Sequence, residues 1–292
     1  MATPRDYALT IHGGFGTTPE NTDFAPSLRH VAAAGAALLA DGAPALDAVT
    51  LCVQLLEDDP LFNAGRGSVL TANGHVEMDA AIMDGRNLAA GAVAGVRGVR
   101  NPVRAARAVM ERSGHVFLVA EGAEAFAAAA GCEMASADYF LTAERRAEHA
   151  RRQTGAAKLG TVGAVARDAA GDLAAATSTG GVPGKRYGRV GDSPVIGAGV
   201  FADNASCAVS CTGVGEDFLR MSIARLVGFL IEEKGMDAET AAAEAIRRMI
   251  ARISGVGGLI VVDRAGRCGR AKTGEGLMTA IARPGFISVE TR

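Results

Sequence analysis

The sequence of 292 residues has no stretch of about 20 residues that is both apolar and free of charge, the length that a transmembrane helix needs. We therefore expect no membrane-spanning segment. Acidic and basic residues nearly balance, giving a formal net charge of −2. Proteins that bind nucleic acid through its phosphates carry a basic surface, so we also expect no nucleic-acid partner.

Cysteine and histidine are both scarce, and neither shows the spacing of a metal site. The cysteines are odd in number, scattered and set mostly in apolar runs, where small buried thiols are expected: Cys52, Cys132, Cys207, Cys211 and Cys268. No His-Glu-x-x-His motif is present, and we expect no cofactor for catalysis. The first six residues lack the apolar core of a secretory signal, so the sequence predicts a cytoplasmic protein.

The Gly-x-Ser-x-Gly motif of many serine hydrolases is absent too. Just past the middle of the chain, however, Gly160 and Thr161 open a run of small apolar residues. A threonine hydroxyl is a weak nucleophile unless a base takes its proton, and a threonine that begins a chain carries that base as its own α-amine. An α-amine has a pKa of about 7.7 to 8, so its neutral form is available near physiological pH. Taken alone, Gly-Thr is better explained as the start of a β-strand.

Several motifs surround this dipeptide in a fixed order. Downstream stand Thr-Ser-Thr-Gly-Gly at 177–181, Gly-Arg-Val-Gly-Asp-Ser-Pro at 188–194 and Ser-Cys-Thr-Gly-Val-Gly-Glu at 210–216. Upstream stand His-Gly-Gly at 12–14 and Leu-Phe-Asn-Ala-Gly at 61–65. Together they resemble the plant-type asparaginase and isoaspartyl peptidase family of N-terminal-nucleophile hydrolases. Several motifs in one order make this signal more specific than a single short match.

The resemblance implies that the chain cleaves itself between Gly160 and Thr161, giving fragments 1–160 and 161–292. Thr161 would then be the catalytic nucleophile. Glycine before it has no Cβ and can enter the strained geometry that this attack requires. The resemblance also places Thr179 beside the nucleophile, hydrogen-bonded to it, and Asn63 close enough to help orient it.

The same resemblance assigns the contacts with substrate. The Thr212 hydroxyl and the Gly213 N–H match an oxyanion hole, which stabilises the negative charge of a tetrahedral intermediate. Arg189 is expected to hold an α-carboxylate through two parallel N–H bonds, and Asp192 and the Gly215 carbonyl to bind an α-ammonium. Without the resemblance, Arg189 and Asp192 would be interpreted as a salt bridge within a turn.

Residues 56–66 resemble a loop whose backbone carbonyls hold a sodium ion in some members of the family. Oxygen ligands suit such a hard cation. The carbonyls implied as ligands of this structural ion belong to six residues: Leu56, Glu57, Asp59, Phe62, Ala64 and Arg66. The acidic run in this loop is equally explained as the end of a helix in solvent.

Apolar periodicity predicts strands in two runs, each followed by helices, and the resemblance implies that residues 1–292 form a single domain. In the first half we expect strands at 7–12, 75–83, 91–96 and 116–119, and helices at 27–40, 46–56, 103–112, 121–130 and 137–151. In the second half we expect strands at 161–167, 173–177, 205–211 and 258–262 and near the C-terminus, and helices at 216–234 and 238–253. Two sheets between helical layers suit this pattern. The resemblance implies an α+β fold of the N-terminal-nucleophile type, a four-layer αββα sandwich.

The implied activity is hydrolysis of the β-amide of L-asparagine or of β-aspartyl dipeptides, by a dimer of cleaved heterodimers. The two substrates present the same reacting groups, so the sequence does not rank them. Departures from the family pattern bear on specificity: Phe15 follows His-Gly-Gly, Val214 separates Gly213 from Gly215, and Lys-Thr-Gly-Glu-Gly occupies 272–276.

Two alternatives remain open. The first is a glycosylasparaginase-like hydrolase, which uses the same threonine chemistry; the glycine that precedes Thr161, where aspartate is usual, and the expected lack of a secretory signal disfavour it. The second is a small-molecule-binding protein that has the same fold and does not mature.

Overall fold

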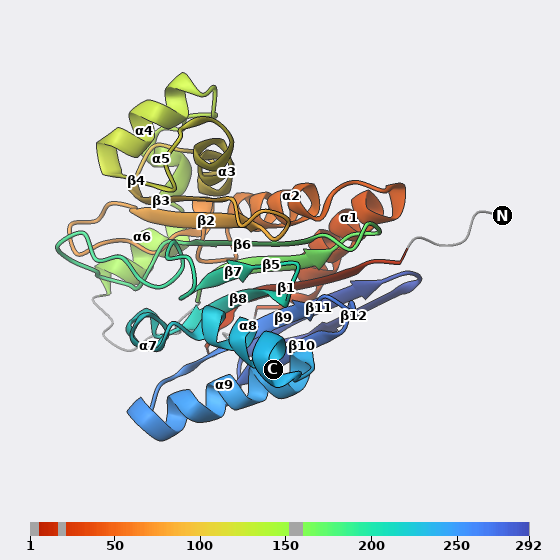
Figure 1. Ribbon diagram of the computed structural model, residues 1–292. Helices are drawn as coiled ribbons and strands as arrows, with labels where there is room; N and C mark the ends of the chain where they lie inside the picture. Colours follow the sequence, from red (N-terminus) through yellow and green to blue (C-terminus); the bar gives the residue numbers. More distant parts are fainter. Residues whose placement is uncertain (1–5, 17–21, 152–159, 292) are drawn as a thin grey trace.

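The computed structural model describes residues 6–16, 22–151 and 160–291 (Figure 1). The first part of the chain forms, in order, β1 (Ala8–Phe15), α1 (Ala25–Asp41), α2 (Ala45–Asp58), a 3₁₀ turn η1 (Gly65–Gly67), β2 (Met78–Asp84), β3 (Ala90–Val96), α3 (Pro102–Arg112), β4 (Phe117–Val119), α4 (Ala120–Ala129), α5 (Ala137–Phe140) and α6 (Ala143–Ala150). The second part forms β5 (Val162–Arg167), β6 (Leu173–Thr179), β7 (Val200–Ala202), β8 (Cys207–Gly213), α7 (Gly215–Met221), α8 (Ile223–Lys234), α9 (Ala238–Ile253), β9 (Gly257–Asp263), β10 (Cys268–Lys272), β11 (Leu277–Arg283) and β12 (Phe286–Glu290).

The strands of the described residues form two sheets. One has the order β12-β11-β1-β5-β6-β2-β3-β4, and the other has the order β10-β9-β8-β7. Strands from both ends of the chain lie side by side in the first sheet, because β1 pairs with β11 on one edge and with β5 on the other. Thr161 immediately precedes β5, which is one of the central strands of this sheet.

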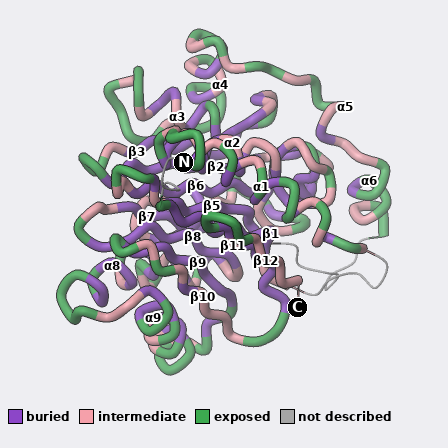
Figure 2. The backbone as a smooth tube through the Cα atoms, turned by 90° about the vertical axis from the view of Figure 1, so that its right-hand side faces the viewer, coloured by how far each residue is buried: buried purple, intermediate pink, exposed green. Residues whose placement is uncertain are grey.

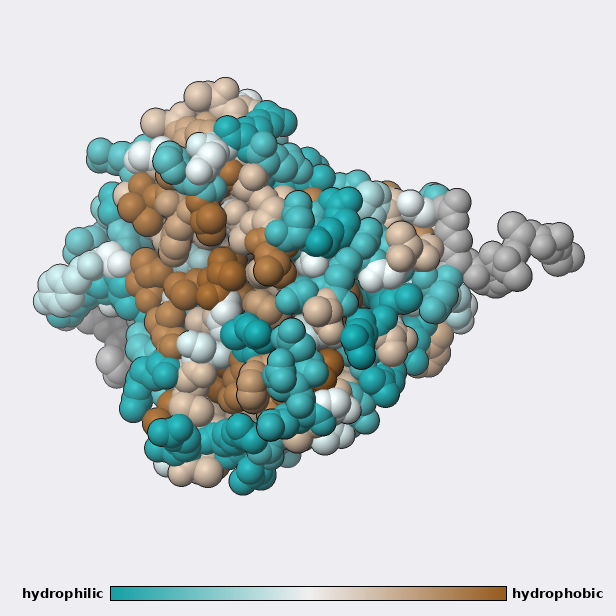
Figure 3. Space-filling model, viewed as in Figure 1, coloured by the Kyte–Doolittle hydropathy of each residue, from teal (hydrophilic) through white to brown (hydrophobic). Residues whose placement is uncertain are grey.

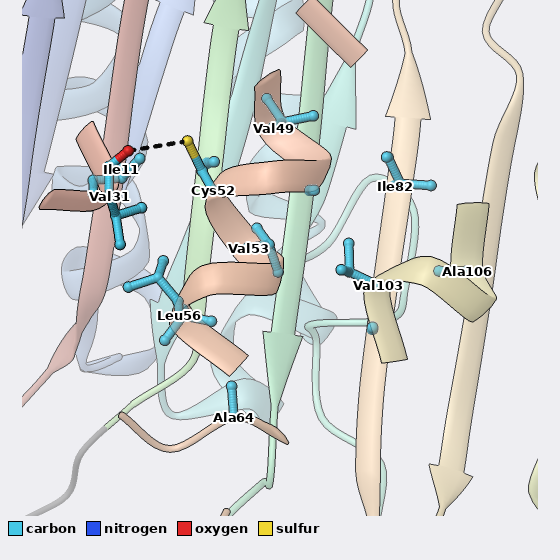
Figure 4. Close-up of a cluster of buried hydrophobic side chains, with 14 of the residues drawn as sticks. Ile11, Val31, Val49, Cys52, Val53, Leu56, Ala64, Ile82, Val103 and Ala106 are labelled. Carbon is cyan, nitrogen blue, oxygen red and sulfur yellow. Dashed lines mark hydrogen bonds between the residues drawn. The ribbon is translucent and has the colours of Figure 1, made fainter. Parts of the chain in front are cut away.

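Helices α1, α2 and α3 cover one face of the eight-stranded sheet (Figure 1). Figure 4 shows how α2 contributes to this core: Val49, Cys52 and Val53 point from the helix toward the strands. All three are fully buried, and the Cys52 thiol donates to the Val31 carbonyl of α1 at 3.7 Å. Apolar positions three and four residues apart place these side chains on one helix face.

The other face of that sheet packs against the four-stranded sheet, whose far side is covered by α8 and α9. The central strands of both sheets are buried, as the tubes of Figure 2 show, whereas the edge strands β4, β10 and β12 are partly exposed. Hydrophilic residues cover α9 on the outside (Figure 3). There Glu244 pairs with Arg247 and Arg248 at 2.7 Å each, so these arginines form the polar face of a helix.

Most predicted elements are present, with boundaries shifted by a few residues. Two predicted helices are each divided in two. The helix expected at 137–151 is interrupted at Leu141, and Thr142 caps the next helix by accepting the N–H of Arg145 at 3.2 Å. The helix expected at 216–234 is interrupted at Ser222, which has a left-handed backbone with φ of 49°. The short strand β7 had not been predicted, because three residues give no periodicity.

Candidate active site

A cavity of about 300 Å³ lies at the start of β5 and at the ends of β6 and β8. Its walls include most of the residues predicted to act in catalysis or binding: Gly160, Thr161, Thr179, Arg189, Asp192, Gly213 and Gly215. Thr161 follows the register of β5 against β6, which pairs Val162 with Ser178 and so sets Thr161 opposite Thr179. The segment 152–159 that leads to Gly160 lies outside the described residues.

Gly160 is held in a space with no room for a side chain. A Cβ there would collide with the Thr212 hydroxyl and lie 2.9 Å from the Phe15 nitrogen. Gly14, with φ of 120°, is pressed against the same residue, since a Cβ on Gly14 would lie 2.8 Å from both the nitrogen and the carbonyl oxygen of Gly160. Gly160, which precedes Thr161, is thus confined by the Gly14–Phe15 backbone and by the Thr212 side chain.

The hydroxyl of Thr161 has a partner that the sequence analysis did not identify. Its Oγ1 lies 2.7 Å from Oγ of Ser193, and both residues are buried. The Thr179 hydroxyl instead accepts the N–H of Gly181 at 3.0 Å. The hydrogen bond that the resemblance implies between Thr179 and Thr161 is therefore replaced here by the one to Ser193, although the two threonines lie opposite each other on paired strands.

Asn63 lies behind Thr179 and fixes the turn that follows it. Its Nδ2 donates to the carbonyl of Gly181 at 2.8 Å, its carbonyl accepts the N–H of Gly180 at 3.0 Å, and its Oδ1 accepts the N–H of Val69 at 2.9 Å. In this geometry Asn63 positions the Thr179 turn, so any effect on Thr161 is indirect.

Thr212 carries a buried hydroxyl without a hydrogen-bond partner among the described residues. Burying such a group without a partner costs about 1–3 kcal/mol. This hydroxyl lies against Gly160, since a Cβ on Gly160 would collide with it. The next residue, Gly213, has φ of 147°, and a Cβ on it would lie 2.5 Å from the Val256 carbonyl. Only glycine brings the backbone this close to the neighbouring loop.

Arg189 is held by a second residue that the sequence analysis missed. Its Nε and Nη2 donate to the two carboxylate oxygens of Glu216 at 2.9 and 2.8 Å. This contact lowers the pKa of the Glu216 carboxyl. The turn salt bridge with Asp192 is not the arrangement found. Glu216 occupies the two parallel N–H groups expected to hold an α-carboxylate, and Nη1 lies beside Gly191, where a Cβ would be 2.8 Å away. A fork–fork pair of this kind fixes the plane of the guanidinium.

Asp192 is buried, and its Oδ2 has no hydrogen-bond partner among the described residues. Burial raises the pKa of this carboxyl to about 7 despite the positive charge of Arg189. Gly215 passes between the two side chains, because a Cβ on it would lie 2.9 Å from both Arg189 Nη2 and Asp192 Oδ1. A buried carboxylate of this kind suits a cationic ligand, which would supply the missing partner.

A buried ion pair behind the cavity was also missed. Lys185 Nζ lies 4.0 Å from Asp79 Oδ2, with both side chains almost fully buried, and it donates to the Glu77 carbonyl at 2.7 Å. Asp79 pairs with Thr179 across β2 and β6. The sequence gives no local signal for this pair, because the two residues lie far apart in the chain.

The three departures from the family pattern surround the cavity. Phe15 and Val214 line it. The segment 272–276 supports it from outside: Gly276 accepts the N–H of Gly16 at 3.0 Å, and Thr273 accepts the N–H of Gly257 through its hydroxyl at 3.0 Å. Phe15 and Val214 are thus placed to affect substrate specificity directly, and 272–276 through the loops it holds.

The predicted cation loop follows the end of α2, where carbonyl groups lose their helical partners. Pro60 has no N–H to offer Leu56, and the N–H of Leu61 bonds the Asp59 side chain at 3.0 Å instead of the Glu57 carbonyl. A Cβ on Gly65 would collide with the Glu57 carbonyl oxygen. The carbonyls of Leu56 and Glu57 thus lack their helical partners, whereas those of Asp59 and Ala64 accept the N–H groups of Phe62 and Gly67 at 3.2 and 3.1 Å.

The helix end itself is not in solvent, as one interpretation of the acidic run had it. Glu57 is fully buried and its Oε1 accepts the N–H of Val103 at 2.9 Å, at the start of α3. Burial raises the pKa of this carboxyl to about 8. The neighbouring Asp58 accepts the hydroxyl of Tyr139 at 3.0 Å.

Side-chain metal sites and membrane spans were searched in residues 6–16, 22–151 and 160–291. No three His, Cys, Asp or Glu side chains in these ranges gather in a way that suits a metal ion. Every helix in the same ranges is too short or too polar for a membrane span.

The sequence matches the family described as Asparaginase over residues 5–288. It is 46% identical to an isoaspartyl peptidase of Salmonella typhimurium, covering 93% of this chain and 94% of that one. It is 45% identical to an isoaspartyl peptidase/L-asparaginase of Homo sapiens, covering 96% and 94%. It is 44% identical to an isoaspartyl peptidase of Escherichia coli, covering 93% and 91%.

Proposed function

Because the chain belongs to the asparaginase family, which its sequence matches almost from end to end, we propose that it hydrolyses the β-amide of L-asparagine and the β-aspartyl bond of isoaspartyl dipeptides. Thr161 is the nucleophile in this proposal, after the chain has cut itself before that residue. The four-layer αββα arrangement of N-terminal-nucleophile hydrolases, formed by one domain, is the fold that we assign to it.

One observation carries the proposal. Gly160 and Thr161 share a cavity with Arg189 and with Asp192, whose Oδ2 has no hydrogen-bond partner among the described residues. An anion site and a cation site next to a hydroxyl nucleophile match a substrate that bears an α-carboxylate, an α-ammonium and an acyl group on the same small molecule. The volume of about 300 Å³ is in the range of small-molecule sites.

In the first step, Thr161 Oγ1 attacks the carbonyl carbon of Gly160. The C–N bond breaks, the hydroxyl proton ends on the departing nitrogen, and that nitrogen becomes the α-amine of a new N-terminus. Water then hydrolyses the ester, which releases the carboxylate of Gly160 and restores the hydroxyl. The tight packing of Gly14, Phe15 and Thr212 around Gly160 supports this step, because it holds the reacting atoms close together.

In turnover, the free amine of Thr161 takes the proton of its own hydroxyl. The oxygen attacks the β-acyl carbon of the substrate, ammonia or an amino acid leaves, and water completes the hydrolysis to aspartate. The hydroxyl of Thr212 and the N–H of Gly213 stabilise the oxyanion. Arg189 binds the α-carboxylate through those of its N–H groups that do not bond to Glu216. Asp192 and the Gly215 carbonyl bind the α-ammonium.

The protonation of Asp192 predicts how binding depends on pH. The raised pKa of about 7 means that the carboxylate is mostly charged at pH 8 and mostly neutral at pH 6. Only the charged form pairs with an α-ammonium, so the inhibition constant of L-aspartate, the expected product, should rise roughly tenfold as the pH falls from 8 to 6. Competitive inhibition measured across this range checks it. In Asp192→Asn, inhibition should be weaker and independent of pH; a flat wild-type profile would count against this role.

For the loop after α2 we propose a structural sodium ion, held by the carbonyls of Leu56, Glu57, Asp59, Phe62, Ala64 and Arg66. The missing helical donors at the end of α2 support it. Replacing sodium by choline at equal ionic strength should lower Tm by about 2–4 °C, the effect of losing about 1 kcal/mol. A thermal melt in each salt measures this, with potassium as a control for cation size. Equal Tm values in sodium and choline would remove the ion from the proposal.

The assembly and compartment follow from the same proposal: a dimer of cleaved heterodimers in the cytoplasm, acting on small molecules without a cofactor in catalysis. Parallel assays separate it from the alternatives. Release of aspartate from β-aspartyl dipeptides or asparagine supports the proposal. Faster hydrolysis of glycosylasparagine would favour a glycosylasparaginase, and an uncut chain that binds aspartate without hydrolysis would favour a binding protein.

A further inference from the structure

Before cleavage the nitrogen of Thr161 is part of an amide, so the base that serves turnover does not yet exist. The hydroxyl must nevertheless be directed toward the Gly160 carbonyl. Its contact in the uncut chain is Ser193, with 2.7 Å between the two hydroxyl oxygens. Ser193 is 1% exposed and Thr161 is 6% exposed, so the contact is shielded from water, which would otherwise compete for it.

Ser193 is fixed from three sides. Its carbonyl accepts the hydroxyl of Thr177 at 2.6 Å. Pro194 follows it, and a residue before proline is confined to extended conformations. Gly199 packs so closely that a Cβ there would lie 2.9 Å from the Cα of Ser193. These contacts leave the serine hydroxyl little freedom except rotation about its own side-chain bond.

The two threonine hydroxyls nearest the cleavage site make no hydrogen bond to the Thr161 hydroxyl. Thr179 Oγ1 accepts the N–H of Gly181 at 3.0 Å. Thr212 Oγ1 lies against Gly160 and has no hydrogen-bond partner among the described residues. Ser193 is thus the hydroxyl placed to accept the hydrogen of Thr161.

We propose that Ser193 orients the nucleophile for self-cleavage: its Oγ accepts the Thr161 hydroxyl hydrogen, which leaves an Oγ1 lone pair directed at the Gly160 carbonyl carbon. Ser193 itself neither gains nor loses a proton in the balanced step, since the hydroxyl proton ends on the Thr161 nitrogen. After cleavage the new α-amine takes over as hydrogen-bond acceptor. Ser193 therefore matters more to maturation than to turnover. This inference rests on the proposed function.

The test compares two rates in one variant. Ser193→Ala should slow self-cleavage about tenfold, as the loss of an orienting hydrogen bond predicts. Once fully cut, the same variant should lose a smaller factor in kcat for a β-aspartyl dipeptide, about threefold, because the free α-amine of Thr161 then accepts the hydroxyl hydrogen. Intact-mass spectrometry over time gives the first rate, and steady-state kinetics give the second. Ser206→Ala is the matched control, because Ser206 is equally buried but lies at the opposite end of β8 from Thr212.

Ser193→Cys, which is similar in size and a weaker hydrogen-bond acceptor, should cleave at an intermediate rate. It also provides the comparison if the alanine variant fails to fold. Wild-type cleavage rates in Ser193→Ala and Ser193→Cys would overturn the inference while leaving the proposed function intact. So would faster cleavage, or an equal loss in cleavage and kcat. A wild-type chain that never cuts itself would instead overturn the proposed function.

Discussion

Thr161→Ala should remain a single chain of 292 residues and lose activity by roughly 10⁴-fold or more in kcat/KM. One oxygen performs both the self-cleavage and the attack on substrate, so its removal should abolish both. Thr161→Ser keeps that oxygen and should cleave at least partly. Denaturing gels and aspartate release measure the two effects.

Because Thr161 is buried against Ser193, loss of fold must be separated from loss of chemistry. Uncut Thr161→Ala should melt as one cooperative unit and still contain the cavity with Arg189 and Asp192. Binding of L-aspartate by calorimetry is a suitable control. Wild-type activity in folded Thr161→Ala would contradict the assignment of the nucleophile.

Thr212→Val should lower kcat by roughly 10²- to 10³-fold, the usual cost of removing one oxyanion donor. The same change should stabilise the protein by about 1 kcal/mol, because it removes a buried hydroxyl that has no partner among the described residues. Valine has nearly the shape of threonine, so packing should be kept. Activity and stability should therefore change in opposite directions, as expected for a group retained for catalysis.

The stability effect is measured best in the Thr161→Ala background, where the chain stays uncut and urea titrations can be compared directly. Thr10→Val is the matched control: the Thr10 hydroxyl is also buried without a partner among the described residues, and it lies within β1, paired with Val165 and Ile281. It should give a similar gain in stability and leave kcat unchanged. A loss of stability in Thr212→Val, or unchanged kcat, would remove Thr212 from the oxyanion hole.

The sequence predicted the site residues through the resemblance of its ordered motifs to the family, not through any one motif taken alone. Gly160, Thr161, Asp192 and Gly213 lie within such motifs, and the structure places all of them around one cavity. Most helices and strands were predictable for a related reason, because apolar periodicity is a local property.

The parts that escaped prediction depend on contacts between distant segments. Ser193 contacts Thr161, which lies 32 positions earlier in the sequence, and Glu216 contacts Arg189, which lies 27 positions earlier. Nothing near Glu216 in the sequence reveals that its carboxylate holds an arginine of another loop. The break at Ser222 also escaped prediction: its backbone is left-handed, with φ of 49°, where the local apolar pattern favours one long helix.

The central claim is that an internal threonine becomes the catalytic N-terminus. The most direct test is intact-mass analysis and N-terminal sequencing of purified wild-type protein, combined with an assay on β-aspartyl dipeptides. The account predicts two fragments, 1–160 and 161–292, the second beginning Thr-Val-Gly, and activity that appears in step with them. Release of aspartate by a chain that remains uncut would contradict it.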